Sequence, residues 1–134
     1  MEKGIIIIGK TASGKSTKAY EIASKYKQSE VICFRGEKKK TFEDKYWSSF
    51  CKEETKIVIF DDTKFNNIDL CFFAEIQEFG VFVHKKNKNA FKIYPQIIIV
   101  IDSNSNNILK KIPEYVKNYF EIIECTSTFI NREE

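Results

Sequence analysis

The stretch GIIIIGKTASGKST, residues 4–17, decides the fold. Its four consecutive isoleucines predict a short strand buried on both faces, and they lead directly into a loop of small and polar residues. Gly9 and Gly14 let the backbone of this loop wrap closely around an anion, and the helix-compatible segment 18–26 would add its positive amino end. The stretch therefore predicts a strand, an anion-binding loop and a helix in succession.

Residues 9–16 match the pattern G-x-x-x-x-G-K-[ST]. In this pattern Lys15 would reach the β- and γ-phosphates of a nucleotide, and the Ser16 hydroxyl would bind Mg²⁺. The alternative is a glycine-rich turn without a ligand, which the strand before the loop and the helix after it disfavour. We therefore predict a site for ATP and Mg²⁺, with the nucleotide-binding residues Gly9, Thr11, Ala12, Ser13, Gly14, Lys15, Ser16 and Thr17.

Short apolar runs bounded by polar residues recur along the chain and predict buried strands. They lie at 5–8, 31–34, 57–60, 97–101 and 120–123. Segments compatible with helices alternate with them, at about 15–27, 66–79 and 107–118. This alternation predicts a single α/β domain over 1–134, a three-layer sandwich with a five-stranded, mainly parallel sheet.

One segment, VFVHKKNKNAFKI at 81–93, breaks this rhythm. Apolar and polar residues alternate in it around a polar tip, which predicts an inserted β-hairpin. Residues 84–92 hold four lysines and no acid, so the tip is suited to gripping the phosphates of a nucleic-acid strand. The alternative is a solvated hairpin tip without a partner. The segment also holds His84, the only histidine of the chain, and no second metal ligand accompanies it.

The run KIVIFDD, residues 56–62, predicts a strand that ends in two acids. The carboxyl edge of a parallel sheet is where such folds bind ligands, so Asp61 is the predicted Mg²⁺ ligand. Asp62 would then act as the general base that polarises the attacking water. The alternative is a pair of exposed acids that cap the strand, with Asp62 as the N-cap of a short helix.

The run QIIIVIDSNSN, residues 96–106, predicts another buried strand, lying beside the strand of the acids. Asn104 would orient the lytic water against the γ-phosphate. Ordinary turn chemistry leading into the next helix is an equal alternative. The predicted catalytic residues are thus Lys15, Asp62 and Asn104, and the predicted metal ligands are Ser16 and Asp61.

Composition narrows the possibilities further. The net charge of +3 is too small to indicate nucleic acid by itself. The four cysteines lie far apart without a C-x-x-C pair, which predicts reduced, mostly buried thiols in a cytosol-like compartment. The apolar runs are too short for a membrane span or a signal peptide. We therefore expect a protein that is not secreted, located in the cytoplasm or, if viral, in the host nucleus or cytoplasm.

Five features in order resemble superfamily 3 helicases, in particular the compact P-loop ATPase domain of small-virus replication proteins, both circovirus-type initiators and picornavirus-like ATPases. These features are GKTASGKS, the aromatic YWSSF, the acids of IVIFDD, the hairpin HKKNKNAF and IIIVIDSN. They extend over residues 4–123, almost the whole chain. In such ATPases one strand lies, along the chain, between the P-loop strand and the acidic Walker B strand. In the sheet, however, we expect the P-loop strand and the Walker B strand to be neighbours.

The resemblance implies an AAA+-like fold and a helicase-like motor that hydrolyses ATP and acts on single-stranded DNA or RNA in replication. It also implies a homo-oligomeric ring, with a monomer as the alternative for an isolated domain, and no membrane. In that family the hairpin projects into the central channel of the ring and grips nucleic acid. The matching residues here are His84, Lys85, Lys86 and Lys88.

Two features depart from the family pattern. No endonuclease or origin-binding segment is present, so we expect an excised domain or a free-standing ATPase. Arginine is scarce, with only Arg35 and Arg132, whereas a ring ATPase normally supplies an arginine finger to its neighbour. Arg132 and the lysines at 110, 111 and 117 are the remaining candidates, so we expect hydrolysis that is slow or depends on lysine or on assembly.

Three other functions are compatible with the same loop. A DNA-packaging or translocating ATPase usually carries glutamine where this chain has residues 102–104. A small nucleoside or nucleotide kinase needs an acceptor site and a lid rich in arginine, and neither is visible. A non-enzymatic nucleotide switch is the third, although no N-K-x-D base-reading motif supports a GTPase.

Overall fold

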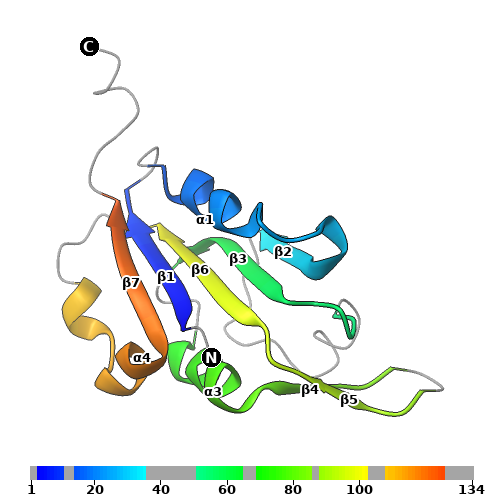
Figure 1. Ribbon diagram of the computed structural model, residues 1–134. Helices are drawn as coiled ribbons and strands as arrows, with labels where there is room; N and C mark the ends of the chain where they lie inside the picture. Colours follow the sequence, from blue (N-terminus) through cyan, green and yellow to red (C-terminus); the bar gives the residue numbers. More distant parts are fainter. Residues whose placement is uncertain are drawn as a thin grey trace.

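A five-stranded parallel sheet forms the centre of the molecule (Figure 1). The computed structural model of the chain describes residues 3–10, 14–35, 51–64, 69–85, 88–102 and 108–125. The strands lie in the order β2-β3-β6-β1-β7, and every neighbouring pair is parallel. Their bounds are Gly4–Gly9 for β1, Val31–Arg35 for β2, Ile57–Lys64 for β3, Gln96–Asp102 for β6 and Phe120–Cys125 for β7. All five predicted strands are confirmed.

Helices cover both faces of this sheet. Helix α1 (Lys15–Ala23) packs on one face, and helices α3 (Leu70–Phe79) and α4 (Glu114–Tyr119) pack on the other (Figure 1). Successive residues of a strand point to opposite faces, so Ile5 and Ile7 lie in the core beneath α1, whereas Ile6 and Ile8 lie in the core beneath α3 and α4. The runs of isoleucine are therefore explained by burial on both faces, and the predicted three-layer sandwich is confirmed.

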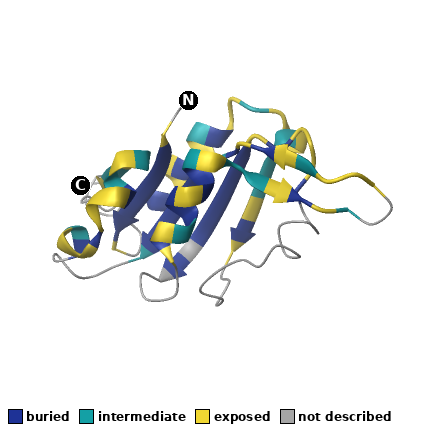
Figure 2. Cartoon of the chain, turned by 90° about the horizontal axis from the view of Figure 1, so that it is seen from below, coloured by how far each residue is buried: buried dark blue, intermediate teal, exposed yellow. Residues whose placement is uncertain are grey.

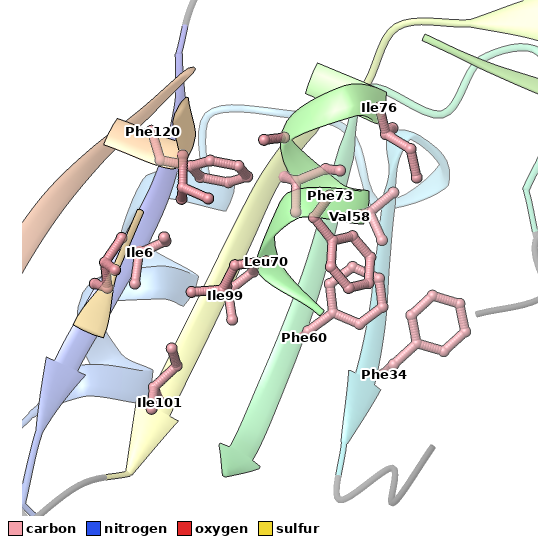
Figure 3. Close-up of a cluster of buried hydrophobic side chains, with 14 of the residues drawn as sticks. Ile6, Phe34, Val58, Phe60, Leu70, Phe73, Ile76, Ile99, Ile101 and Phe120 are labelled. Carbon is pink, nitrogen blue, oxygen red and sulfur yellow. The ribbon is translucent and has the colours of Figure 1, made fainter. Parts of the chain in front are cut away.

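The core beneath α3 is built around phenylalanine rings (Figure 3). Phe60 of β3 stacks on Phe34 of β2, with ring centroids 5.3 Å apart. Phe73 of α3 lies over Phe60 at 4.8 Å between centroids and is fully buried. These contacts tie the helix to the strand that carries the acids.

The neighbours of the P-loop strand differ from the prediction. Strand β3 does not pair with β1, because β6 lies between them and pairs with both. The expectation that the Walker B strand is next to the P-loop strand is therefore wrong. Since β6 is buried from Ile97 to Ile101, the central place in the sheet is the position that its sequence suits best.

Strand β3 runs to Lys64, two residues beyond the paired acids at which the strand was predicted to end. The alternative in which Asp62 caps a helix is also wrong. The N-cap of α3 is Asp69, whose carboxylate accepts a hydrogen bond of 3.2 Å from the backbone N–H of Phe72.

The helices are shorter than predicted. Helix α1 ends at Ala23 instead of 27, and a single 3₁₀ turn, η1 (Gln28–Glu30), precedes β2. Helix α3 begins at Leu70, and 65–68 lie outside the described residues. The predicted helix 107–118 is divided into a 3₁₀ helix, η3 (Ile108–Lys111), and α4, because Pro113 excludes its predecessor from helical geometry. Residues 36–50, between β2 and β3, lie outside the described residues.

The predicted hairpin is present as β4 (Val81–Val83) and β5 (Phe91–Ile93), an antiparallel pair separate from the main sheet. It begins directly after α3, at Gly80, whose φ of +78° is a conformation that L side chains rarely adopt. It ends three residues before Gln96, the first residue of β6. The hairpin therefore leaves the molecule at the amino end of β6, opposite to the end where the P-loop lies (Figure 1).

The thiols differ from the prediction in their burial. All four are free, but only Cys51 is buried; Cys33 and Cys71 are exposed and Cys125 is half-buried. The expectation of mostly buried thiols is therefore wrong. As to membranes, the helices found in the described ranges are all too short or too polar to span a bilayer.

Helix α3 offers a matched test of the core. We expect Phe73→Ala to lower the free energy of unfolding by about 3–5 kcal/mol, because it empties the space beneath the helix. Phe79→Ala removes the same ring from the same helix at a position that is 58% exposed, and we expect a change within about 0.5 kcal/mol. Urea denaturation followed by circular dichroism measures both, and equal losses would contradict this packing.

Candidate nucleotide-binding site

The carboxyl ends of β1, β6 and β3 meet at one edge of the sheet, and the predicted phosphate loop leaves from it. Gly9 is the last residue of β1 and pairs with Asp102, the last residue of β6. Gly14, directly before α1, has a φ of 89° and a ψ of 13°, the left-handed conformation that glycine adopts at no steric cost. The two glycines of the motif thus lie where the chain leaves the strand and where it enters the helix.

Lys15 is the first residue of α1 and is 92% buried, with 8% of its surface exposed. Its ammonium donates a hydrogen bond of 2.9 Å to the carbonyl oxygen of Lys10 and lies 3.4 Å from Oδ1 of Asp102. A buried ammonium needs such partners, because its desolvation is otherwise costly. Lys15 is therefore held at the carboxyl ends of β1 and β6, between a backbone carbonyl and a carboxylate.

The loop and the acidic strand are joined by a hydrogen bond. The Ser16 hydroxyl donates to Oδ1 of Asp61 across 2.8 Å. Asp61 is only 3% exposed, although it is an acid at the edge of the sheet. The structure thus brings together the two residues that the sequence predicts as metal ligands.

A β-bulge lies at the paired acids. The ladder between β3 and β6 shifts register between Phe60 and Thr63, so that Asp61 and Asp62 lie opposite a single residue of β6. Such bulges bend a strand and redirect its side chains. The Asp61 carboxylate nevertheless meets α1, as its hydrogen bonds show.

Three residues that no sequence motif marked lie at or near Asp61. The Tyr20 hydroxyl of α1 donates a hydrogen bond of 2.8 Å to Oδ2 of Asp61, and Arg35 at the end of β2 lies 3.3 Å from the same oxygen. Arg35 also donates to the Tyr20 hydroxyl across 2.9 Å, and the Cys33 sulfur lies 3.3 Å from that hydroxyl. Asp61 is thus contacted by a hydroxyl from each of two successive turns of α1 and by one guanidinium.

The phenol of Tyr20 stays protonated in these surroundings. Burial raises its pKa above the usual value, and the hydrogen bonds with Cys33 and Asp61 act in the same direction. A neutral phenol is a donor to a carboxylate, which agrees with the contact to Asp61. A signal for Tyr20 existed in the sequence, since it lies one helical turn after Ser16 and therefore on the same face of α1. No comparable signal marked Arg35, because its position depends on how β2 pairs with β3.

The donor atoms at this edge fit a magnesium ion. Mg²⁺ prefers hard oxygen ligands, and it is usually held by one or two protein side chains together with phosphate oxygens and water. A serine hydroxyl and a carboxylate 2.8 Å apart at the amino end of a helix meet this requirement. The described part of the chain holds no group of three or more His, Cys, Asp or Glu able to bind a metal by themselves.

Other predicted residues lie elsewhere or are not described. The backbone of Asp62 is part of β3, while its side chain, Thr11, Ala12, Ser13, Lys86 and Asn104 lie outside the described residues. Thr17 is exposed on α1. Lys85, Lys88 and His84 belong to the hairpin, at the other end of the sheet. The roles given to all these residues remain predictions.

Comparisons with known proteins agree with this fold. No family model matches the chain, and no curated protein matches it either. Among solved structures, NtrX from Brucella abortus in complex with ADP superposes with a TM-score of 0.55 at 13% identity, covering 95% of this chain and 33% of that one. The apo C-terminal region of NrS-1 is a weaker match, with a TM-score of 0.43 at 12% identity, covering 92% of this chain and 29% of that one.

At these identities the likeness concerns the fold alone, and the NtrX match carries it. The chain spans about a third of the length of the solved structures that it matches. Together with the strand order and the loop between β1 and α1, the match defines the class: the chain has the α/β fold of P-loop NTPases.

The cation beside Asp61 leads to a prediction. The guanidinium of Arg35 competes with a divalent cation for the same carboxylate, so we expect Arg35→Gln to tighten Mn²⁺ binding by about 2- to 5-fold in the absence of nucleotide. Electron paramagnetic resonance titration with Mn²⁺ measures this affinity. The matched control is Lys56→Gln, which removes the cation paired with Glu30 at the other end of β3. Weaker Mn²⁺ binding in Arg35→Gln would contradict the competition.

Proposed function

We propose that the chain binds ATP with Mg²⁺ and hydrolyses it as a helicase-like motor domain that acts on single-stranded nucleic acid in replication. The observation that carries the nucleotide part is the hydrogen bond of 2.8 Å between Ser16 and Asp61. It joins the hydroxyl of Ser16 at the start of α1 to the acid of β3, the two groups that would share a nucleotide-bound metal ion.

In this proposal, phosphate oxygens would replace the present partners of Lys15. Its ammonium now lies against a carbonyl oxygen and the Asp102 carboxylate, and oxygens of the β- and γ-phosphates would take over these positions. Ser16 and Asp61 would hold Mg²⁺, whose charge offsets that of the phosphates. The exposed Thr17 and the backbone of residues 11–13 would complete the phosphate loop.

We assign hydrolysis to residues at the carboxyl ends of β3 and β6, at the same edge of the sheet. Water would attack the γ-phosphorus, its proton would pass to the Asp62 carboxylate, and the bond from the γ-phosphorus to the oxygen of ADP would break. Asn104 would orient this water. The sheet order supports the assignment, because β6, which ends two residues before Asn104, lies between the P-loop strand and the strand of Asp62.

The nucleic-acid part of the proposal is supported by the charge of the hairpin. No acid occurs in the sequence from residue 79 to residue 101, and Lys85 and Lys88 stand near the tip. Lysines on a projecting loop attract a phosphate backbone. The proposed roles of His84 and Lys86 rest on the resemblance to superfamily 3 helicases.

The first test concerns Lys15. We expect Lys15→Ala to weaken ATP binding by about 10- to 150-fold, because it removes a charged hydrogen bond to phosphate. Isothermal titration calorimetry with a non-hydrolysable ATP analogue and Mg²⁺ measures the affinity. Lys18→Ala, which removes an exposed lysine of the same helix, is the matched control and should bind like wild type. If Lys15→Ala kept full affinity, the nucleotide site would have to lie elsewhere.

The second test concerns the hairpin lysines. We expect single-stranded DNA or RNA to accelerate ATP hydrolysis, and we expect Lys85→Ala with Lys88→Ala to abolish this acceleration at unchanged ATP affinity. Lys18→Ala with Lys25→Ala removes the same charge from α1 and the turn that follows it, on the opposite face of the sheet, and should retain the acceleration.

Three further assays on the wild-type protein distinguish the motor from the other functions. Phosphate transfer from ATP to a nucleoside, without any effect of nucleic acid, would favour a small kinase. The size of the particle in ATP and Mg²⁺, measured by light scattering, separates the motor from the kinase and the switch, because only the motor is expected to form a ring. ATP binding without hydrolysis in any condition would leave the nucleotide site standing and remove the motor.

A further inference from the structure

The outer face of the hairpin presents two aromatic rings on either side of one ammonium. Phe82 and Lys92 are directly opposite each other in the antiparallel pair, and Tyr94 follows two residues after Lys92. The Lys92 ammonium lies 5.2 Å from the centroid of the Phe82 ring and 5.4 Å from that of Tyr94. These distances are those of cation–π pairs.

Both rings are exposed, Phe82 by 54% and Tyr94 by 55%. The hairpin has an inner, apolar face, because Val83 and Ile93 are buried in the same cluster as the buried apolar residues of α3. Figure 2 shows the hairpin strands with both buried and exposed positions. Alternation then places Phe82, Lys92 and Tyr94 on the face turned to solvent. The Tyr94 ring packs with one edge beside Gly80, and slightly more than half of each of the two side chains is left to solvent.

The segment that carries this face is basic in sequence. The acid-free segment 79–101 covers the whole hairpin and the start of β6. The nearest acid along the chain, Glu78, is engaged on the other side, where its carboxylate accepts hydrogen bonds from Tyr115 and Tyr119 of α4. The face thus combines two exposed π-surfaces with the ammonium of Lys92.

We propose that Phe82 and Tyr94 form a stacking surface for the bases of single-stranded nucleic acid, with Lys92 held between the rings to meet the phosphate backbone. Single strands expose the faces of their bases, and stacking on aromatic side chains beside basic residues is how proteins bind them without sequence preference. A duplex keeps its bases stacked inside and offers no such faces. This inference rests on the proposed action on nucleic acid. It adds to the lysines of the tip a second set of residues that would bind the strand.

One binding experiment without ATP separates the contribution of the bases to the affinity from that of the phosphates. The probes are a fluorescein-labelled oligothymidylate of about 12 nucleotides and an abasic deoxyribose-phosphate chain of the same length. We expect the full chain to bind the oligothymidylate about 5- to 150-fold more tightly than the abasic chain by fluorescence anisotropy, since each stacked base contributes that much. Phe82→Ala with Tyr94→Ala should remove this difference and retain the binding of the abasic chain.

Two further variants keep the result interpretable. Phe82→Leu with Tyr94→Leu preserves an apolar face without π-surfaces and should lose the preference for bases. Tyr115→Ala, the matched control, removes a partly exposed ring from α4 and should keep the preference. On the unmodified chain, irradiation of an oligonucleotide that contains 5-iodouracil should crosslink it to Phe82 or Tyr94, a result that does not depend on any variant folding correctly.

Other outcomes overturn the inference in distinguishable ways. Equal affinity for the two probes would leave a phosphate handle and remove the stacking surface. Binding of neither probe, with ATP binding intact, would remove the nucleic-acid part of the proposed function as well. Loss of self-association in the alanine variant, without change in the preference for bases, would mean that the face is a contact between copies of the chain.

Discussion

The hydrogen bond between Ser16 and Asp61 is the contact on which the arrangement of the site depends. It joins residues 45 positions apart in the chain, one at the start of α1 and one in β3. Helix α1 follows β1 in the chain, but β1 and β3 are not neighbours in the sheet, because β6 lies between them. The contact therefore forms only if all three strands end at the same edge, and a parallel sheet achieves this.

The burial of Asp61 makes this contact more than a local hydrogen bond. A carboxylate that is 3% exposed loses most of its hydration and has to be compensated by donors from the protein. Ser16, Tyr20 and Arg35 supply them from α1 and β2. The acid thus draws two elements toward the edge of β3.

The hairpin extends the molecule away from this edge. Its inner residues belong to the core beneath α3, so its orientation is set by packing rather than by the tip. It connects directly to the amino end of β6, whose carboxyl end carries Asp102 beside Lys15. One buried strand, β6, therefore connects the hairpin to the edge where Lys15 and Asp102 meet.

Much of this molecule was determined by the sequence alone, because its signals are local. Runs of isoleucine buried on both faces, the spacing from Gly9 to Ser16 and the alternation around the hairpin tip predicted the sheet, the loop and the hairpin. Only the tertiary structure decided the place of β6 between β1 and β3, the bulge at the acids, and the approach of Arg35 to Asp61. These features depend on which strands pair and in what register, and pairing is set by contacts between segments far apart in the chain, which no local pattern encodes.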